Sequence, residues 1–149
     1  MAHLARRLGG LTMATRVTPA DRASSLGQTS EMGRSIAISA DRVGSVRLYS
    51  SVVTTAPGGK TRIHHHADCE TSIYIASGTA RYTWGPTGLE HAMDAEAGDF
   101  VYIPAGEIHV EENASDTEPL VVVLTRNCPD SVVVYVDGGP QEPDVQAPC

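Results

Sequence analysis

Residues able to bind a metal are concentrated in one short stretch of this chain. Residues 58–70 read GGKTRIHHHADCE. Successive side chains of a strand point to opposite faces, so His64 and His66 converge while His65 points away. Glu70 follows after a short turn and can supply a carboxylate oxygen. Two imidazoles and a carboxylate together suit a divalent transition metal.

A second segment supplies another histidine. Residues 98–113 read GDFVYIPAGEIHVEEN. A strand over 100–103 is followed by the turn Pro104-Ala105-Gly106, after which a new strand brings His109 back. A metal site needs ligands from separated segments of the chain. The packing of these segments must offset the conformational entropy that the ligand side chains lose when they are held together. We therefore expect one metal on His64, His66, Glu70 and His109, with Glu70 also the catalytic base when substrate displaces it.

Four aromatic residues are candidates for a substrate cavity. Tyr82 and Trp84 share one strand face, and Phe100 and Tyr102 share another. Such residues either line the cavity or pack in the core, and the sequence leaves both interpretations open.

The elements that position these residues are short strands. Runs rich in Val, Ile, Thr and Tyr alternate with turns such as Pro57-Gly58-Gly59 and Ser77-Gly78, and no helical periodicity is sustained. The pattern predicts an all-β barrel over residues 35–137, after an N-terminal arm over 1–34 and before an irregular tail over 138–149. The strands are expected at 35–39, 45–55, 63–66, 71–76, 79–84, 100–103, 108–112, 120–125 and 131–136.

The composition of the chain limits its possible binding partners and its expected cellular location. A net charge of −7 disfavours nucleic acid, and no apolar run approaches the roughly 20 residues that cross a membrane. Three widely spaced cysteines, at 69, 128 and 149, do not suggest a disulfide framework. Cys69 is then a soft metal ligand, a redox-sensitive neighbour or a small buried residue. We expect a cytoplasmic protein.

Both chemical segments resemble the paired motifs of the cupin family, in particular small single-domain bacterial cupins. The first motif, G-x5-H-x-H-x3-E, is matched by Gly58, His64, His66 and Glu70. The second, G-x5-P-x-G-x2-H-x3-N, is matched by Gly98, Pro104, Gly106, His109 and Asn113. The resemblance implies a jelly-roll barrel, or double-stranded β-helix, with a metal held at its mouth.

One position departs from the family pattern. The closing glycine of the first motif is expected at Ser77, but the glycine stands one residue later, at Gly78. A four-residue gap before the carboxylate, which the family also tolerates, would place Thr71 at the ligand position. Because Thr is a poor ligand beside an available carboxylate, Glu70 is assigned.

The family resemblance also frames the function. We expect a metal-dependent enzyme acting on a small oxygenated organic molecule, most simply a dioxygenase-like oxidoreductase with Fe(II); Mn, Ni, Cu and Zn also suit the ligands. The alternatives are a non-redox isomerase, lyase or cyclase, and a metal-stabilised binding module without turnover. Related single-domain cupins cover their edge strands with a second subunit, so a homodimer is expected.

Overall fold

Two antiparallel sheets form the protein. The computed structural model describes residues 13–27, 29–87 and 89–136. Its strands are β1 (Ala23–Leu26), β2 (Met32–Ile38), β3 (Tyr49–Thr55), β4 (His64–His65), β5 (Thr71–Ser77), β6 (Thr79–Trp84), β7 (His91–Glu96), β8 (Phe100–Ile103), β9 (His109–Asn113), β10 (Leu120–Arg126) and β11 (Val134–Tyr135). The predicted all-β class is confirmed.

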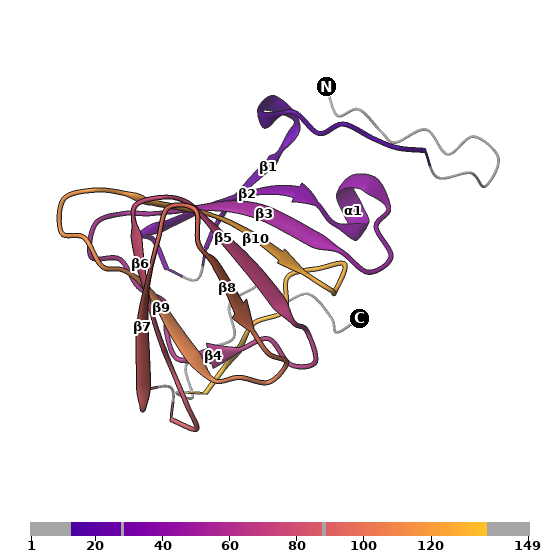
Figure 1. Cartoon of the computed structure of the whole chain (residues 1–149). Coiled ribbons are helices and arrows are strands. Elements are labelled where there is room, and N and C mark those ends of the chain that lie inside the picture. Colours follow the sequence, from indigo (N-terminus) through magenta and orange to yellow (C-terminus); the bar gives the residue numbers. More distant parts are fainter. Residues whose placement is uncertain (1–12, 28, 88, 137–149) are drawn as a thin grey trace.

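The two sheets lie face to face (Figure 1). One has the strand order β1-β2-β3-β10-β5-β8, and the other has the order β11-β4-β9-β6-β7. Neighbours far apart in sequence, such as β3 and β10, are hydrogen-bonded side by side. Helical structure within the described part is limited to η1 (Pro19–Asp21) and α1 (Ala40–Val43). None of these described helices is long and apolar enough to cross a membrane.

Strand alternation fills the space between the sheets. In β5 the buried positions are Thr71, Ile73 and Ile75, and the intervening side chains are exposed. In β10 the same alternation buries Leu120, Val122, Leu124 and Arg126. The core is therefore aliphatic along most of both strands, while a threonine and an arginine enter it where β5 begins and β10 ends.

Two residues of the motif segments, Gly78 and Asn113, have structural roles. Gly78 turns the chain between β5 and β6 with φ +88°, and a Cβ there would lie 2.7 Å from the carbonyl oxygen of Pro119. Asn113 is buried, and its amide donates to three backbone carbonyls, those of Thr55, Ala56 and Glu118. Both residues hold loops at one end of the barrel.

The sheets contain strands that the sequence did not predict. β1 and the first residues of β2 lie within 1–34, the segment interpreted as an arm, and they extend the first sheet. β7 was missed because it is an edge strand whose residues, HAMDAE, are mostly exposed and lack clear alternation. The expected tail over 138–149 lies outside the described residues.

A disulfide joins Cys69 to Cys128, with 5.9 Å between their Cα atoms. The prediction that the cysteines form no disulfide is wrong, because sequence spacing did not reveal the strand register. Thr71 pairs with Arg126 across β5 and β10, and the two cysteines lie two residues beyond that pair. Disulfides are typical of oxidising compartments, so the cysteines no longer support a cytoplasmic location.

We expect the double variant Cys69→Ser/Cys128→Ser to be less stable. The disulfide spans 59 residues, for which the chain-entropy model gives about 4 kcal/mol of unfolding free energy. Denaturant titration of the variant and the wild type measures the difference. Cys149→Ser is the matched control and should match the wild type. Equal stability of all three proteins would show that the bond does not constrain the folded chain.

Candidate metal centre

Three histidines and one glutamate meet in the barrel interior. His64 lies on β4 opposite His109 on β9, and His66 follows just after β4. Glu111 lies two residues after His109 on the same strand. One potential ligand atom from each of the four residues lies within 4.8 Å of the others. That spacing allows a single ion to contact all four.

Backbone carbonyls hold the three imidazole rings in place. Each ring uses Nδ1 for a hydrogen bond to a carbonyl oxygen, at 2.6–2.8 Å. Since a carbonyl only accepts, Nδ1 carries the proton, and Nε2 is the nitrogen that each ring would offer to a metal. The pairs are His64 with Arg62, His66 with Val132, and His109 with Glu107.

Burial keeps the donor set in the protonation state that a metal needs. Desolvation, reinforced by the neighbouring His109, lowers the pKa of His64 to about 3. Desolvation and the charge of Arg126 also lower the pKa of His66 well below its usual value. Burial alone would raise the pKa of Glu111, but the close approach of its carboxylate to His109 and the positive charge of Arg126 lower it to about 2. At neutral pH these two histidines are therefore neutral and Glu111 is ionised.

Unsatisfied polar atoms fit a divalent ion at this place. His109 Nε2 and Glu111 Oε1 are buried without a hydrogen-bond partner among the described residues, and they lie 3.5 Å apart. Buried polar atoms are rarely left unpaired, because desolvating them costs free energy. Three imidazole nitrogens and one carboxylate oxygen are a suitable donor set for a first-row transition metal.

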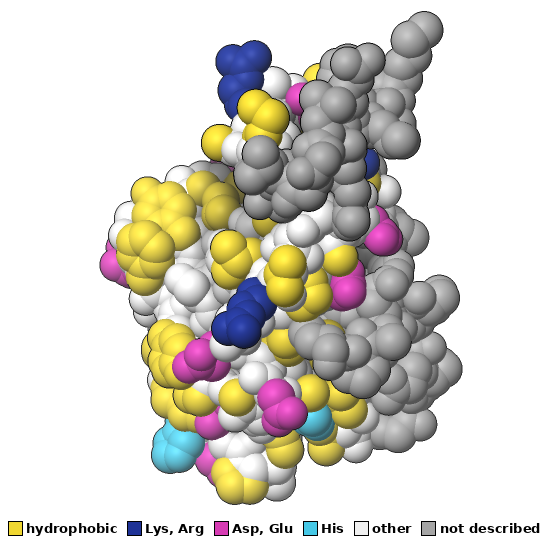
Figure 2. Space-filling model, turned by 90° about the vertical axis from the view of Figure 1, so that its right-hand side faces the viewer, with side chains coloured by type: hydrophobic (Ala, Val, Ile, Leu, Met, Phe, Trp, Pro, Cys, Tyr) yellow, Lys and Arg dark blue, Asp and Glu magenta, His cyan; other side chains and the backbone are white. Residues whose placement is uncertain are grey.

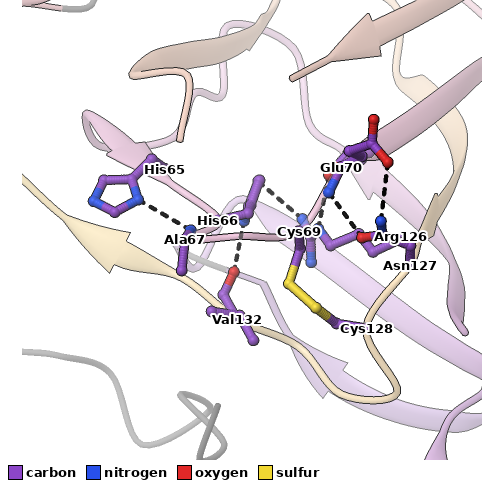
Figure 3. The surroundings of a disulfide bond; sticks show 10 residues. His65, His66, Ala67, Cys69, Glu70, Arg126, Asn127, Cys128 and Val132 are labelled. Carbon is purple, nitrogen blue, oxygen red and sulfur yellow. Dashed lines mark hydrogen bonds between the residues drawn. A yellow bond between two sulfur atoms is a disulfide. The ribbon is translucent and has the colours of Figure 1, made fainter. Parts of the chain in front are cut away.

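The structure does not bring Glu70 to the histidines. Its side chain is exposed, and its carboxylate accepts a hydrogen bond from Tyr102 Oη at 2.6 Å. It also accepts one from Asn127 Nδ2 at 3.0 Å (Figure 3). The reason is the register of β5, in which Thr71 points inward and Glu70 precedes the strand. The shifted glycine, Gly78, fits this four-residue register.

Sequence reasoning missed Glu111, although a signal was present. His109 and Glu111 are two residues apart on one strand, so alternation places them on the same face. The same rule had already paired His64 with His66. The first motif predicts Glu70 as the carboxylate, and Glu111 falls on a position that the second motif leaves unspecified.

His65 and the four aromatic candidates lie in different environments. His65 lies outside the cluster, and its ring turns away to accept a hydrogen bond from the Ala67 amide (Figure 3). Of the four aromatic candidates, Tyr82 lines the cavity described below. Trp84 is partly buried against the ring of His91. Phe100 and Tyr102 are 73% and 60% exposed on the outer face of β8.

A small cavity adjoins the cluster within the barrel. Glu111 and Arg126 belong to its wall, together with Arg34, Tyr82 and mainly aliphatic side chains. Both arginines are nearly inaccessible to solvent, with 6% of Arg34 and 2% of Arg126 exposed. Burying two guanidinium groups is unfavourable unless negative charge lies near them, and Glu111 supplies one such charge. On the face drawn in Figure 2, hydrophobic side chains lie in several separate patches among acidic ones.

The comparisons with known proteins agree with this architecture. Residues 51–126 match the family model described as Cupin domain. A probable oxalate decarboxylase of Arthroderma benhamiae is 39% identical over 72 residues, which are 48% of this chain and 18% of that protein. The chain thus matches less than a fifth of the length of that curated relative.

Similarity to solved structures agrees with the family match. The S161A mutant of Bacillus subtilis oxalate decarboxylase is 27% identical, with a TM-score of 0.66 over 76% of this chain and 30% of that one. A second structure of that enzyme, whose subject is its Mn(II) centres, is 29% identical, with a TM-score of 0.64 over 73% of this chain and 29% of that one. The predicted jelly-roll fold is confirmed.

Metal analysis of single variants tests the ligand set. We expect His64→Ala to lower the affinity for Mn(II) by more than the ~10–100-fold that an outer partner of a metal ligand contributes. Glu111→Gln removes the negative charge of the set, so it should also weaken binding. Glu70→Gln is the matched control and should bind as the wild type does. Metal loss from Glu70→Gln with retention by Glu111→Gln would contradict this assignment.

The buried histidines should make the metal-free protein sensitive to acid. An unfolded histidine takes up a proton near pH 6.5, whereas folded His64 does so only near pH 3. Between these values the unfolded chain binds more protons, so stability falls as pH decreases, by about 1.4 kcal/mol per unit for this residue. Urea titration after metal removal, from pH 7.5 to 5, measures the slope. His64→Gln should reduce the slope and His65→Gln should not; a flat wild-type profile would contradict the prediction.

Proposed function

Because the chain belongs to the cupin family, we propose that it is a metal-dependent enzyme acting on a small carboxylic acid, with carbon–carbon lyase chemistry. The observation that carries the proposal is the convergence of three histidines and ionised Glu111 beside a small cavity. The relatives named oxalate decarboxylase support the reaction class.

In this proposal the metal ligands and the cavity wall have separate roles. His64, His66, His109 and Glu111 would hold the metal, which supplies Lewis acidity toward a coordinated oxygen. The single carboxylate leaves the bound ion with net positive charge, which favours an anionic substrate. The aliphatic part of the cavity wall strengthens electrostatic interactions beside it.

Three further side chains would act on the bound acid. Tyr82 remains a protonated phenol, because burial raises its pKa far above neutral, and its position on the cavity wall suits it to hydrogen bonding. Arg126 and Arg34 supply positive charge on the same wall. A carboxylate is the simplest group that satisfies two guanidinium groups at once.

The candidate metals are Mn(II) and Fe(II), and the candidate reactions are those of a lyase and of a dioxygenase. Manganese is the first choice here, since a similar structure concerns Mn(II) centres, whereas the sequence-based expectation was Fe(II). The relatives' names favour a lyase over the dioxygenase that was expected from the sequence. A lyase releases carbon dioxide without consuming oxygen in proportion, whereas a dioxygenase consumes one O₂ for each turnover.

The test is a panel of small carboxylic acids that includes oxalate, with Mn(II)-loaded and Fe(II)-loaded protein. We expect carbon dioxide release on at least one acid, without matching oxygen uptake at an electrode. His64→Ala is the inactive control, and Arg81→Gln, an exposed substitution, is the active one. Oxygen uptake equal to turnover would show a dioxygenase. No turnover by metal-loaded protein would favour a binding module.

A further inference from the structure

The Arg126 guanidinium directly contacts the candidate metal centre. Its Nη2 lies 3.1 Å from His66 Nε2, and its Nε donates to Thr71 Oγ1 at 3.2 Å (Figure 3 shows Arg126 beside His66). Its Nη1 is buried without a hydrogen-bond partner among the described residues. Although burial lowers the pKa of Arg126 to about 10, the group is still charged at neutral pH.

This contact competes with metal binding. His66 uses Nδ1 to bond the carbonyl oxygen of Val132, so Nε2 is the nitrogen that accepts from Arg126. The same Nε2 is the atom that His66 would offer to a metal. One lone pair cannot serve both groups, so a bound metal must displace the guanidinium from His66.

The displaced guanidinium would lie beside a second one. Arg34 also lines the cavity, and its charge lowers the pKa of Arg126, which places the two groups within electrostatic range. Arg34 donates Nη1 to Ser131 Oγ at 3.2 Å, while its Nε is buried and unpaired. The wall also carries the carboxylates of Glu111 and Glu112, and Glu112 lies 3.9 Å from the exposed guanidinium of Arg81. The two buried guanidinium groups with spare donors are suited to hold a small oxyanion.

We propose that Arg126 couples the two ligands of this site: in the metal-free protein it holds His66 Nε2, and once a metal takes that nitrogen, Arg126 turns to bind a small oxyanion together with Arg34. The inference rests on the proposed metal function and adds a coupling mechanism to it. Metal and oxyanion then bind with positive cooperativity, and each raises the affinity of the other by the same factor.

The coupling can be measured without any turnover. The dissociation constant of Mn(II) is determined from the electron paramagnetic resonance of free Mn(II), in formate and in chloride at equal ionic strength. Formate is a small carboxylate with a single negative charge. We expect formate to tighten Mn(II) binding about 10-fold, within the roughly 5–150-fold range common for coupled sites. The reciprocal titration of formate, with and without Mn(II), should give the same factor.

Variants separate coupling from a structural role. Arg126→Met keeps an unbranched side chain and removes the competing donor and its charge. It should bind Mn(II) in chloride at least as tightly as the wild type and lose the formate effect. Arg126→Lys retains the charge and should recover part of that effect. Arg81→Gln, exposed and paired with Asp94 in the wild type, should behave as the wild type does.

Each outcome decides between the alternatives. If Arg126→Met binds Mn(II) more weakly than wild type, Arg126 supports the site and the coupling is wrong. If Arg126→Met does not fold, the wild-type and Arg126→Lys titrations still decide, since equal affinities in formate and chloride would overturn the inference. Wild-type protein that binds Mn(II) without a formate effect contradicts the coupling and leaves the proposed function intact. Wild-type protein that binds no metal contradicts the proposed function itself.

Discussion

Three hydrogen bonds between imidazole Nδ1 atoms and backbone carbonyls determine what the barrel interior can do. They fix the rings of His64, His66 and His109 and leave every Nε2 as a potential ligand. The carbonyls belong to the segments before β4, before β9 and before β11, so the packing of the strands sets the ring orientations. Burial then keeps His64 and His66 neutral.

The register between β5 and β10 connects this centre to the scaffold. Thr71 and Arg126 are directly paired across the two strands, and the disulfide lies two residues beyond them. Asn127 exchanges hydrogen bonds with Glu70 over the same pair of segments (Figure 3). The loop that carries His66 and the strand end that carries Arg126 are therefore held together covalently and by polar contacts.

Much of the fold could be predicted from local pattern. Alternation in residues 71–76 and 120–125 identified strands β5 and β10, and the two motifs located three of the four residues of the cluster. The register after His66 could not be read in the same way, because a turn of one more residue exchanges Glu70 for Thr71 at the inward position. Local alternation also could not show that Cys69 faces Cys128, since their pairing depends on which strands become neighbours.

Glu111 and Arg126 are two residues of the site that were not predicted from the sequence. Glu111 was within reach of the alternation rule, since it lies two residues from His109 on the same strand. Arg126 ends an aliphatic strand, and an arginine there would ordinarily extend into solvent. Only the closure of the barrel shows that it is buried against His66. Electrostatic features of this kind depend on contacts between distant segments, so they emerge from the structure.

The central claim is that Glu111 and the three histidines hold one metal ion. A crystal of the Mn(II)-loaded protein, with anomalous diffraction recorded on both sides of the manganese absorption edge, tests it most directly. The account predicts one anomalous peak in contact with the Nε2 atoms of His64, His66 and His109 and a carboxylate oxygen of Glu111, with Glu70 remaining bonded to Asn127. A peak coordinated by Glu70, or one that leaves Glu111 outside the coordination sphere, would contradict it.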